Sequence, residues 1–317
     1  MIAPRVVSMG GGHGLAVTLT ALRSLTEEIT AIVTVADNGG SSGRLRTEFN
    51  SLPPGDLRMA LAALCSDDSW GRGWAEIMQY RFSGAGNTGG HALGNLLLTA
   101  LWDRGEDPVR GLDRVGELLK VVGRVLPMAL VPLDIEGTFS TPTGICVVRG
   151  QVEVATSKGA LQSLRLIPEQ PSATPEALEA IAAADFLTFG PGSWFSSVMP
   201  HFLLREQALA IQNSRAKKIF ILNLAEPKSG YEFAGFSATE HLELVLSQLP
   251  DLQIDCAIAD PAVVEAEESR AKLKDLEDLL GKSGGELIVE TLARSPGSLH
   301  HDPQKLTSVF QHIFSRA

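Results

Sequence analysis

The chain of 317 residues has little cysteine, a deficit of positive charge and no long apolar run. Its three cysteines, Cys65, Cys146 and Cys256, lie far apart and form no CxxC pair, so we interpret them as buried thiols in a reducing cytosol. No apolar stretch approaches the roughly 20 residues that cross a bilayer, and the N-terminus lacks the apolar stretch of a signal peptide. The sequence therefore predicts a cytoplasmic protein that does not bind membranes.

Negative charge is in excess, because 37 acidic residues face 27 lysines and arginines and the formal net charge is −10. This balance opposes binding to nucleic-acid polymers, although a local cluster could still hold a small anion such as a nucleotide. Hydrophobic residues make up 44% of the chain and charged residues 20%, which is typical of a folded globular protein.

Short apolar segments alternate with amphipathic ones, which favours an α/β fold with a mostly parallel sheet and helices on both faces. We expect strands at about Arg5 to Met9, Ile29 to Ala36, Asp185 to Phe189, Lys218 to Leu224 and Leu252 to Ala259. We expect helices at about Leu15 to Ser24, Phe195 to Asn213 and Thr239 to Gln248, and a further one after the predicted N-cap Thr174.

The middle of the chain interrupts this alternation. The region from Pro54 to Arg124 is mostly helical in pattern, and around "GICVVRGQVEVAT" the pattern becomes that of strands, with Arg149-Gly150 as the predicted hairpin turn. A small β-hairpin insertion at about 126–170 would then separate a glycine-rich half, about 1–125, from a second α/β half, about 171–317. Because the chain has no long polar linker and no repeat, we expect one domain over 1–317.

The first candidate for a binding site is "SMGGGHG", between the first strand and the first helix. Glycines there let backbone N–H groups approach an anion at a helix N-terminus, so we favour phosphate binding by Gly10, Gly11, Gly12, His13 and Gly14. A G-x-G-x-x-G dinucleotide fingerprint would need glycine where Leu15 stands, and the Lys-Ser/Thr of a P-loop is also missing. The alternative is a tight turn that lets strand and helix pack closely, which would explain one or two of the glycines.

The second candidate is "VTVADNGGSSGRLR", after the second strand. The carboxyl ends of neighbouring parallel strands share one edge, so this loop should lie beside the first. Its hydroxyls and guanidinium groups could meet phosphate oxygens, and Asp37 could hold a ribose hydroxyl or Mg²⁺. The alternatives are an Asx turn and a solvated helix face. The residues concerned are Asp37, Asn38, Ser41, Ser42, Arg44 and Arg46.

Two helix starts carry further polar residues. In "LPPGDLRMALAAL" we expect Asp56 to be an N-cap, whereas Arg58 in the first turn would oppose the helix dipole unless an anion or a carboxylate lies nearby. In "GAGNTGGHALGNLLLTAL" we expect His91 and Asn95 to lie four residues apart on one face of an apolar helix. Such residues could be satisfied core groups, or His91 could donate a hydrogen bond or shuttle a proton.

The second half offers another strand, glycine turn and helix in "FLTFGPGSWFSSVMP". Here Ser193 could cap the helix or bind an anion, while Asn223 and Glu226 at the next strand end could read a base or sugar. Near the C-terminus, His300, His301 and Asp302 could suggest a metal site, but we favour the start of a helix at Asp302-Pro303.

These segments together resemble the CofD-like family, and within it the gluconeogenesis factor branch rather than the 2-phospho-lactate transferase branch. The matching stretches run from Gly10 to Leu306 and are "GGGHG", "VTVADNGGSSGRLR", "LPPGDLR", "GHALGNLL", "PEALEAIAAADFLTFGPGSWFSSVMPHFLL" and "HDPQKL". The resemblance implies a Rossmann-like fold, a cytoplasmic location and a diphosphonucleoside ligand. For this branch it implies a UDP-sugar, notably UDP-N-acetylglucosamine, and a regulatory role in cell shape and wall-precursor supply through a protein partner.

The sequence departs from the pattern of that family at four places. His13 stands where threonine is common, Asn38 where a second aspartate is frequent, and His300 where the family has an arginine. The longer "EPKSGYEF" replaces a short Gly-Glu-Thr loop after Asn223. Loss of the second acid at Asn38 weakens a two-carboxylate metal site and leaves Asp37 as the candidate ligand for magnesium.

We therefore expect a regulatory UDP-sugar-binding protein rather than an enzyme. The alternative is a phospho-lactyl-type transferase that uses a nucleotide diphosphate donor and magnesium, and the glycine spacing disfavours a third class, NAD-dependent oxidoreductases. Apolar surface helices are compatible with a homodimer. The expected ligand-binding residues are Gly10, Gly11, Gly12, His13, Gly14, Asp37, Asn38, Ser41, Ser42, Arg44, Arg58, His91, Asn95, Gly190, Pro191, Gly192, Ser193 and Asn223.

Overall fold

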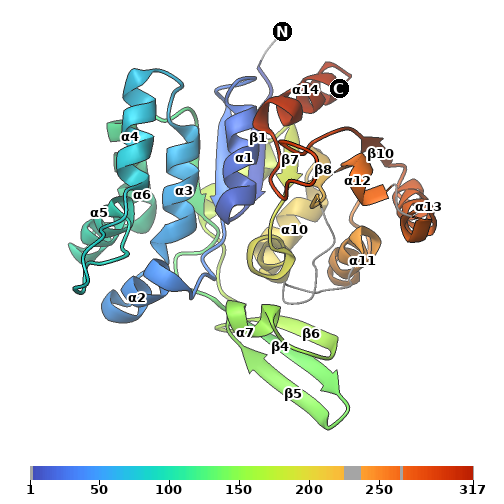
Figure 1. Cartoon of the computed structure of the whole chain (residues 1–317), viewed down its shortest axis with the longest axis horizontal. Helices are drawn as coiled ribbons and strands as arrows, with labels where there is room; N and C mark the ends of the chain where they lie inside the picture. The colour runs from blue at the N-terminus through green and yellow to red at the C-terminus, as the bar shows by residue number, and fades with distance from the viewer. Residues whose placement is uncertain (1–2, 225–236, 265–266, 317) are drawn as a thin grey trace.

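A seven-stranded parallel sheet forms the centre of the molecule in the computed structural model, which describes residues 3–224, 237–264 and 267–316 (Figure 1). The strand order is β10-β9-β8-β7-β1-β2-β3. The strands are β1 (Val6–Gly10), β2 (Ile29–Val33), β3 (Arg124–Pro127), β7 (Phe186–Phe189), β8 (Lys217–Ile221), β9 (Cys256–Ala259) and β10 (Glu286–Val289).

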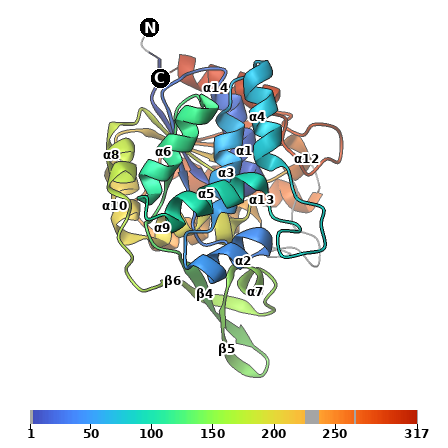
Figure 2. The ribbon, with the colours of Figure 1, turned by 90° about the vertical axis from the view of Figure 1, so that its left-hand side faces the viewer.

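The order of the strands reverses between β1 and β7. From β1 the chain continues to β2 and β3 on one side, and from β7 it continues to β8, β9 and β10 on the other. Right-handed crossovers in opposite directions place their helices on opposite faces of a sheet. Accordingly α1 (Gly12–Leu22), α3 (Pro54–Leu64) and α14 (Pro303–Ser315) pack on one face, and α8 (Pro175–Ala183) and α10 (Arg205–Asn213) on the other (Figure 2).

The remaining helices flank this core or connect its strands. Within the described residues, no helix combines the length and the apolar composition required to cross a membrane. The remaining helices are α2 (Gly40–Phe49), α4 (Ser69–Gln79), α5 (Leu93–Asp103), α6 (Pro108–Leu119), α7 (Gln151–Ala155), the π-helical turn η1 (Trp194–Val198), α9 (Pro200–Leu203), α11 (Ala238–Gln248), α12 (Pro261–Val264) and α13 (Glu267–Gly281).

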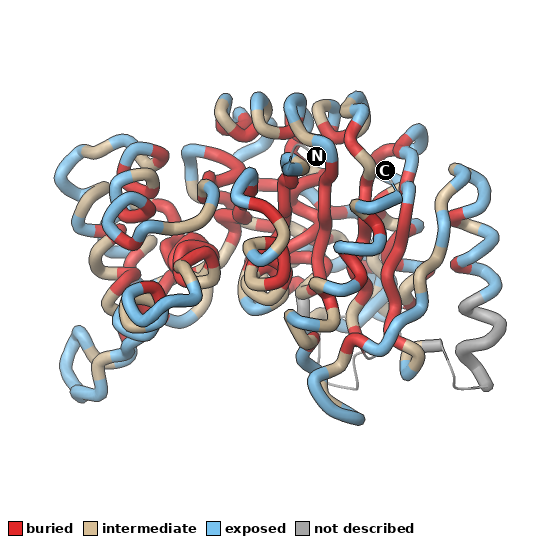
Figure 3. The backbone as a smooth tube through the Cα atoms, turned by 90° about the horizontal axis from the view of Figure 1, so that it is seen from above, coloured by how far each residue is buried: buried red, intermediate tan, exposed pale blue. Residues whose placement is uncertain are grey.

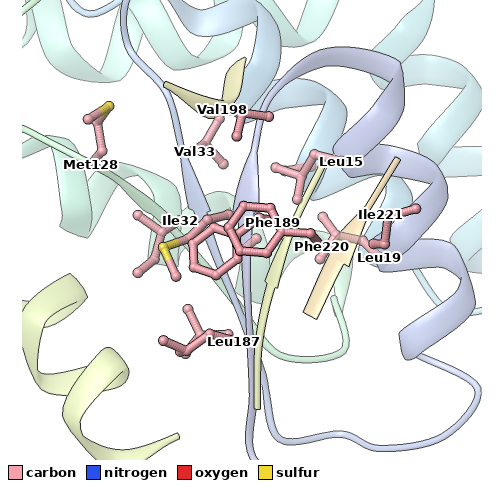
Figure 4. Close-up of a cluster of buried hydrophobic side chains, with 14 of the residues drawn as sticks. Leu15, Leu19, Ile32, Val33, Met128, Leu187, Phe189, Val198, Phe220 and Ile221 are labelled. Carbon is pink, nitrogen blue, oxygen red and sulfur yellow. The ribbon is translucent and has the colours of Figure 1, made fainter. Parts of the chain in front are cut away.

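The strands other than the edge strand β10 are buried along almost their whole length, as the predicted apolar runs require for a sheet covered on both faces (Figure 3). Figure 4 shows the core beside the central strands, where the rings of Phe189 and Phe220 stack with centroids 4.7 Å apart. Leu15 and Leu19 of α1 complete this cluster from the helical layer. The α/β fold with a mostly parallel sheet and helices on both faces is thus confirmed.

The insertion forms a second, antiparallel sheet with the order β5-β4-β6, made of β4 (Asp134–Thr141), β5 (Gly144–Arg149) and β6 (Ala160–Ile167). The prediction of a hairpin turn at Arg149-Gly150 is wrong. The turn lies at Pro142-Thr143, between β4 and β5. Gly150 instead leads into α7, with a φ of +114° and its N–H donating to Ile135 O at 2.8 Å.

The predicted helix from Phe195 to Asn213 is also wrong as one continuous element. It is divided into η1, α9 and α10. Proline has no N–H for the helical ladder, and its ring interferes with the preceding turn, so Pro200 begins a new helix instead of continuing η1. The other predicted strands and helices are present with ends that differ by a few residues, and α3 to α6 confirm the helical region from Pro54 to Arg124.

Candidate functional site

The candidate site lies at the carboxyl ends of four adjacent strands, β8, β7, β1 and β2. The reversal of strand order falls between β1 and β7, so the loops that follow these two strands flank it. In open α/β sheets, ligands bind outside the carboxyl ends of the strands at such a switch point. The predicted glycine turns at Gly11–Gly14 and Gly190–Ser193 occupy this position.

These two glycine turns are packed directly against each other. A Cβ added to Gly14 would lie 1.8 Å from the carbonyl oxygen of Pro191, so only glycine fits there. The hydroxyl of Thr18, on α1, donates to Gly190 O at 3.1 Å and joins the two turns further. Gly12 has a φ of +58°, a conformation that favours glycine. Close packing therefore accounts for part of the glycine content that the sequence also associates with an anion.

Asn223, at the end of β8, fixes the second glycine turn. Its Oδ1 accepts from the Gly192 N–H at 2.9 Å and its Nδ2 donates to Gly192 O at 3.0 Å. Ser193 caps η1, because its hydroxyl accepts from Ser196 N at 3.1 Å. Both side chains therefore have the backbone-satisfying roles that were the alternatives for them, and they hold the turn beside Gly14.

Three helix N-termini meet around this edge. α1 begins after Gly11, α2 after Gly39 and α3 after Pro53, and none of these three has a side-chain cap. The first N–H groups of a helix lack partners inside it and carry the positive end of its dipole. The ends of α1 and α2 thus present backbone N–H groups at positions where glycine leaves the backbone accessible, although the Gly12 N–H of α1 already has the Asp56 carboxylate as a partner.

Asp56 is not the N-cap that the sequence predicts. Pro54 takes the first helical position, for which its fixed φ suits it, so α3 starts earlier and Asp56 lies in its first turn. Its carboxylate reaches the first glycine turn and accepts from the Gly12 N–H. A Cβ on Gly11 would lie 2.4 Å from Asp56 Oδ2, so the glycine makes room for this carboxylate.

The electrostatics of Asp56 are unusual for a carboxylate. Burial and, to a smaller extent, the nearby Asp37 carboxylate raise its pKa to about 7, against the lowering effects of the Gly12 N–H and Arg58. Asp37 itself forms the Asx turn considered as the alternative, with its Oδ1 accepting from Gly39 N at 2.9 Å. The two carboxylates belong to consecutive loops and lie close enough to influence each other.

This pair supplies oxygen ligands of the kind that Mg²⁺ prefers. The sequence weakens a two-carboxylate site because Asn38 replaces the second acid of its own loop, but Asp56 brings a second acid from the next loop. Asn38 donates from Nδ2 to Glu153 Oε2 at 3.4 Å, and within the described residues its Oδ1 is buried without a partner. Asp37 and Asp56 are therefore the residues that fit a divalent cation.

A chain of buried hydrogen bonds runs behind the second loop. Arg58 Nε donates to Asn95 Oδ1 at 2.8 Å, Asn95 Nδ2 donates to Ser41 Oγ at 2.9 Å, and Ser41 Oγ lies 2.9 Å from His91 Nδ1. Arg58 can only donate, so it fixes the orientation of the Asn95 amide. The Ser41 hydroxyl accepts from Asn95, and the direction of its bond to Nδ1 of His91 depends on the tautomer of that imidazole.

Arg58 is the most informative member of this chain. It is only 3% exposed, and burial lowers its pKa to about 10, so it stays charged at neutral pH. In the part of the chain that the structure describes, its Nη1 is buried without a hydrogen-bond partner. A buried cation with an unused donor next to uncapped helix ends is suited to an anion.

The sequence predicts that His91 and Asn95 share one face of a helix, and this prediction is wrong. α5 begins only at Leu93, because the preceding segment pairs with an extended one through an Arg81–Ala92 bridge and a Leu93 N to Tyr80 O bond of 2.8 Å. Both side chains are nevertheless brought together through Ser41. Burial is the main cause that lowers the pKa of His91.

Other predicted residues serve local structure. The Ser42 hydroxyl accepts from Gly55 N at 3.1 Å and so joins the N-termini of α2 and α3. Arg44 donates to Gly89 O at 2.8 Å, while Arg46 is paired with Asp134 at 2.7 Å at the base of the small sheet. His13 is exposed in the first turn of α1.

The C-terminal candidates form no metal site. Asp302 caps α14 by accepting from Gln304 N at 2.8 Å, as favoured from the sequence. His301 is buried with its Nε2 3.1 Å from Leu222 O, and burial lowers its pKa to about 4. Among the described residues, no group of three or more His, Cys, Asp or Glu side chains could hold a metal ion. Glu226 lies outside the described residues.

Sequence reasoning missed the position of Asp56 at the first glycine turn and the contact of Glu153 with the second loop. The signal for Asp56 was present, because a proline at the first helical position places an aspartate two residues later inside the first turn rather than at its cap. Glu153 carried no such signal, since it comes from the inserted region, 115 residues after Asn38.

Comparison with known proteins places the chain among relatives along nearly all its length. The model of the family described as 2-phospho-L-lactate transferase CofD matches residues 6–287. The "Putative gluconeogenesis factor" of Mycobacterium tuberculosis H37Rv is 46% identical over 98% of this chain and 90% of its own length. The "Gluconeogenesis factor" of Listeria innocua is 32% identical over 96% of this chain and 93% of its own length.

A solved structure supports the same relationship. The crystal structure of a UPF0052 family member from Bacillus halodurans covers 98% of this chain and 100% of its own, with a TM-score of 0.84 and 32% identity. Its sheet and helices therefore superpose on most of the present fold. With the family model spanning most of the residues and relatives matching almost end to end, the chain belongs to the CofD family, among the relatives named gluconeogenesis factor.

Proposed function

We propose that this protein binds a UDP-sugar, with UDP-N-acetylglucosamine as the foremost candidate, and acts as a regulatory gluconeogenesis factor of the cytoplasm rather than as an enzyme. In this role the state of the ligand is passed to a protein partner and supports cell shape and wall-precursor supply. The relatives named gluconeogenesis factor support this role.

One observation carries the ligand class. The buried, charged Arg58 has an unused donor, and Asn95 links it to Ser41 in the first turn of α2, a helix whose N-terminus has no side-chain cap. Each of these features favours a negative charge, and a pyrophosphate offers two phosphates to a set of such groups. Because the whole chain has a net charge of −10, these positive groups are a local feature and do not reflect the overall charge of the molecule.

The phosphate contacts would not give sufficient affinity alone. A micromolar dissociation constant requires about −8 kcal/mol, whereas one helix terminus contributes ~0.3 to 1 kcal/mol at an exposed site. The sugar and base must therefore add substantially. The turn held by Asn223 and the exposed His13 lie at the same edge of the sheet and are the candidates for these contacts.

Titration calorimetry and thermal shift with UDP-N-acetylglucosamine, UDP, GDP and NAD test the proposal, each with and without Mg²⁺. We expect the UDP-sugar to bind and to raise the melting temperature more than UDP, and NAD to have no effect. At 100 times the dissociation constant, ligand binding adds about 2.7 kcal/mol to the free energy of unfolding. Absence of both heat and thermal shift with every UDP compound would refute the proposed ligand class.

The second candidate is a phospho-lactyl-type transferase, and the Asp37–Asp56 pair is the observation that favours it. These carboxylates would hold Mg²⁺, which would neutralise charge on the diphosphate of a nucleotide donor. The first-turn N–H groups of α1 and α2 would orient that diphosphate for attack by the acceptor. Incubation with a lactyl-diphospho-nucleotide and a deazaflavin acceptor should then release the nucleotide monophosphate, and no release by a folded sample excludes this activity.

A further inference from the structure

The small antiparallel sheet has an open edge along β5. β5 is the outer strand in the order β5-β4-β6, and in Figures 1 and 2 the hairpin of β4 and β5 projects from the body of the molecule. Ile145 is 78% exposed and Val147 58% exposed. Apolar side chains that are this exposed on an edge strand need a physical explanation.

The hydrogen-bond pattern determines which backbone groups face that open edge. Gly150 N donates to Ile135 O, and the pairing of β4 with β5 continues this register to Thr141 and Gly144. In an antiparallel ladder alternate residues bond to the same neighbour, so the even-numbered residues of β5 bond to β4. The N–H and C=O groups of Ile145, Val147 and Arg149 therefore point to the side where no described strand pairs with β5.

Along most of its length β5 lacks the features that usually protect an edge strand, and its one charged residue, Arg149, lies at its end and is paired with Asp134. From Gly144 to Val148 it has no charge and no proline, and its pairing with β4 is regular. The opposite edge of the same sheet is protected, because β6 carries Arg165 and its pairing with β4 shifts register between Thr138 and Phe139. Charges and bulges on edge strands prevent pairing between molecules, and their absence from the Gly144–Val148 segment of β5 leaves this segment open to pairing.

We propose that β5 pairs with the β5 strand of a second copy of this chain, antiparallel and about a two-fold axis, to join two small sheets into one of six strands. The register that matches apolar residues sets Ile145 opposite the partner's Val147, and Val147 opposite the partner's Ile145. Both pairs then exchange backbone hydrogen bonds through the outward-facing N–H and C=O groups. This inference is independent of the proposed ligand.

A second copy is the occupant that this edge fits, because the edge is self-complementary. A two-fold axis brings the same strand to itself in the antiparallel direction, as a symmetric dimer requires. Ile145 and Val147 lie on one face of β5, so four apolar side chains from the two copies form a continuous strip across the junction. A single pair of strands makes a small interface, so we expect a dimer that dissociates on dilution.

The register also makes a covalent prediction. The interpretation of all three cysteines as buried is wrong for Cys146, which is exposed, whereas Cys65 and Cys256 are buried. In the proposed pairing Cys146 faces the partner's Cys146 at a pair without backbone hydrogen bonds, where Cα atoms are roughly 4.5 Å apart. This separation falls within the roughly 4.4 to 6.8 Å that a disulfide spans, so mild oxidation should join the two thiols with loss of two electrons and two protons to the added oxidant.

Analytical ultracentrifugation over a wide concentration range, together with copper–phenanthroline oxidation, tests the proposal on the full chain. We expect a concentration-dependent dimer and a covalent dimer that the Cys146→Ser substitution abolishes. The double substitution Ile145→Lys and Val147→Lys should give a monomer. Leu299→Lys, which changes another exposed apolar side chain away from the small sheet, should leave the dimer intact.

Two results would overturn the proposal. One is a monomer at high micromolar concentration that forms no covalent dimer on oxidation, which would leave a strand of another protein as the occupant of the edge. The other is a dimer that persists unchanged in the double-lysine variant. If that variant does not fold by circular dichroism, cross-linking of the unmodified chain through Cys146 decides the matter alone.

Discussion

The buried carboxyl of Asp56 combines a structural cost with a position at the candidate site. Its pKa of about 7 in the folded protein exceeds the ordinary value of 3.8, so the folded state binds a proton that the unfolded state has already lost between these pH values. The free energy of unfolding therefore falls as the pH rises from about 4 to about 7. Asp56 lowers the stability of the protein at neutral and higher pH, and is kept at this cost beside the glycine turn.

We predict that Asp56→Asn stabilises the protein relative to the unmodified chain at pH 8, and that this advantage is smaller at pH 5. The stability difference between Asp56→Asn and the unmodified chain should change by about 3 kcal/mol between the two pH values. Two pH units separate pH 5 from the pKa of about 7, and each unit corresponds to ~1.4 kcal/mol. Denaturant unfolding at both pH values measures it. Asp103→Asn, at an exposed carboxylate, should show no such dependence, and an equal effect at both pH values would contradict the assigned burial of the Asp56 charge.

Arg58 is the second residue whose burial predicts a separable effect. We expect Arg58→Met to weaken binding of UDP-N-acetylglucosamine at least tenfold, because the cation with the unused donor is lost. The stability change should stay within about 2 kcal/mol, since removing a buried charge offsets the lost bond to Asn95. Calorimetry and thermal melting separate these two quantities.

Arg124→Met is the matched control for Arg58. Arg124 also donates from Nε to a side chain, that of Asp113 at 2.8 Å, but it lies at the start of β3, at the opposite end of the strands from the candidate site. The control should lose stability and keep its ligand affinity. If both arginine variants bind the UDP-sugar as the unmodified protein does, Arg58 has no part in the site.

Among single residues, the sequence indicated polar side chains that the structure brings together, but it did not predict their contacts. Ser41, His91 and Asn95 were all expected among the ligand-binding residues, and the structure joins them in one chain of hydrogen bonds. Their partners could not be predicted, because Ser41 lies 50 residues from His91 and 54 from Asn95 and only the tertiary packing sets these distances. Arg58 was expected to need an anion or a carboxylate nearby, and Asp56, which the sequence predicted to be a helix cap, is such a carboxylate.

At the scale of elements, replacing glycine with alanine at two positions should change the stability of the protein in opposite directions. Gly14→Ala should destabilise the protein by more than about 2 kcal/mol, because the added Cβ would lie 1.8 Å from Pro191 O and force the two glycine turns apart. Gly73→Ala, in the interior of α4 with nothing within 4 Å of the added atom, should stabilise it by about 0.5 to 1 kcal/mol. Chemical denaturation measures both, and a neutral Gly14→Ala would show that the turns are not packed as described.

The strands were predicted well because burial on both faces leaves a continuous apolar run in the sequence, as in Phe186–Phe189. Breaks and turns were predicted less well. The apolar pattern continues from η1 into α10 although Pro200 interrupts the hydrogen-bond ladder. Arg149-Gly150 resembles a turn, but Arg149 is held by Asp134 at 2.6 Å within the small sheet and Gly150 starts a helix. Local composition does not distinguish these cases, because tertiary contacts decide them.

On the scale of the whole molecule, the order of the strands links the two halves of the chain. β1 lies between β2 from its own half and β7 from the second half, so the central core is built by both. Leu15 and Ile32 of the first half pack in the same cluster as Phe189 and Phe220 of the second (Figure 4). Neither half can bury its side of β1 without the other.

We therefore predict that the two halves unfold together. Trp70, Trp74 and Trp102 lie in the first half and Trp194 in the second, so single-tryptophan variants report on each half separately. Their fluorescence transitions in urea should coincide with each other and with loss of far-ultraviolet circular dichroism, because exposing one side of β1 exposes the shared core. Two separated transitions would instead mean that residues 1–125 and 171–317 are independent folding units that only share a sheet edge, in conflict with the single domain expected from the sequence.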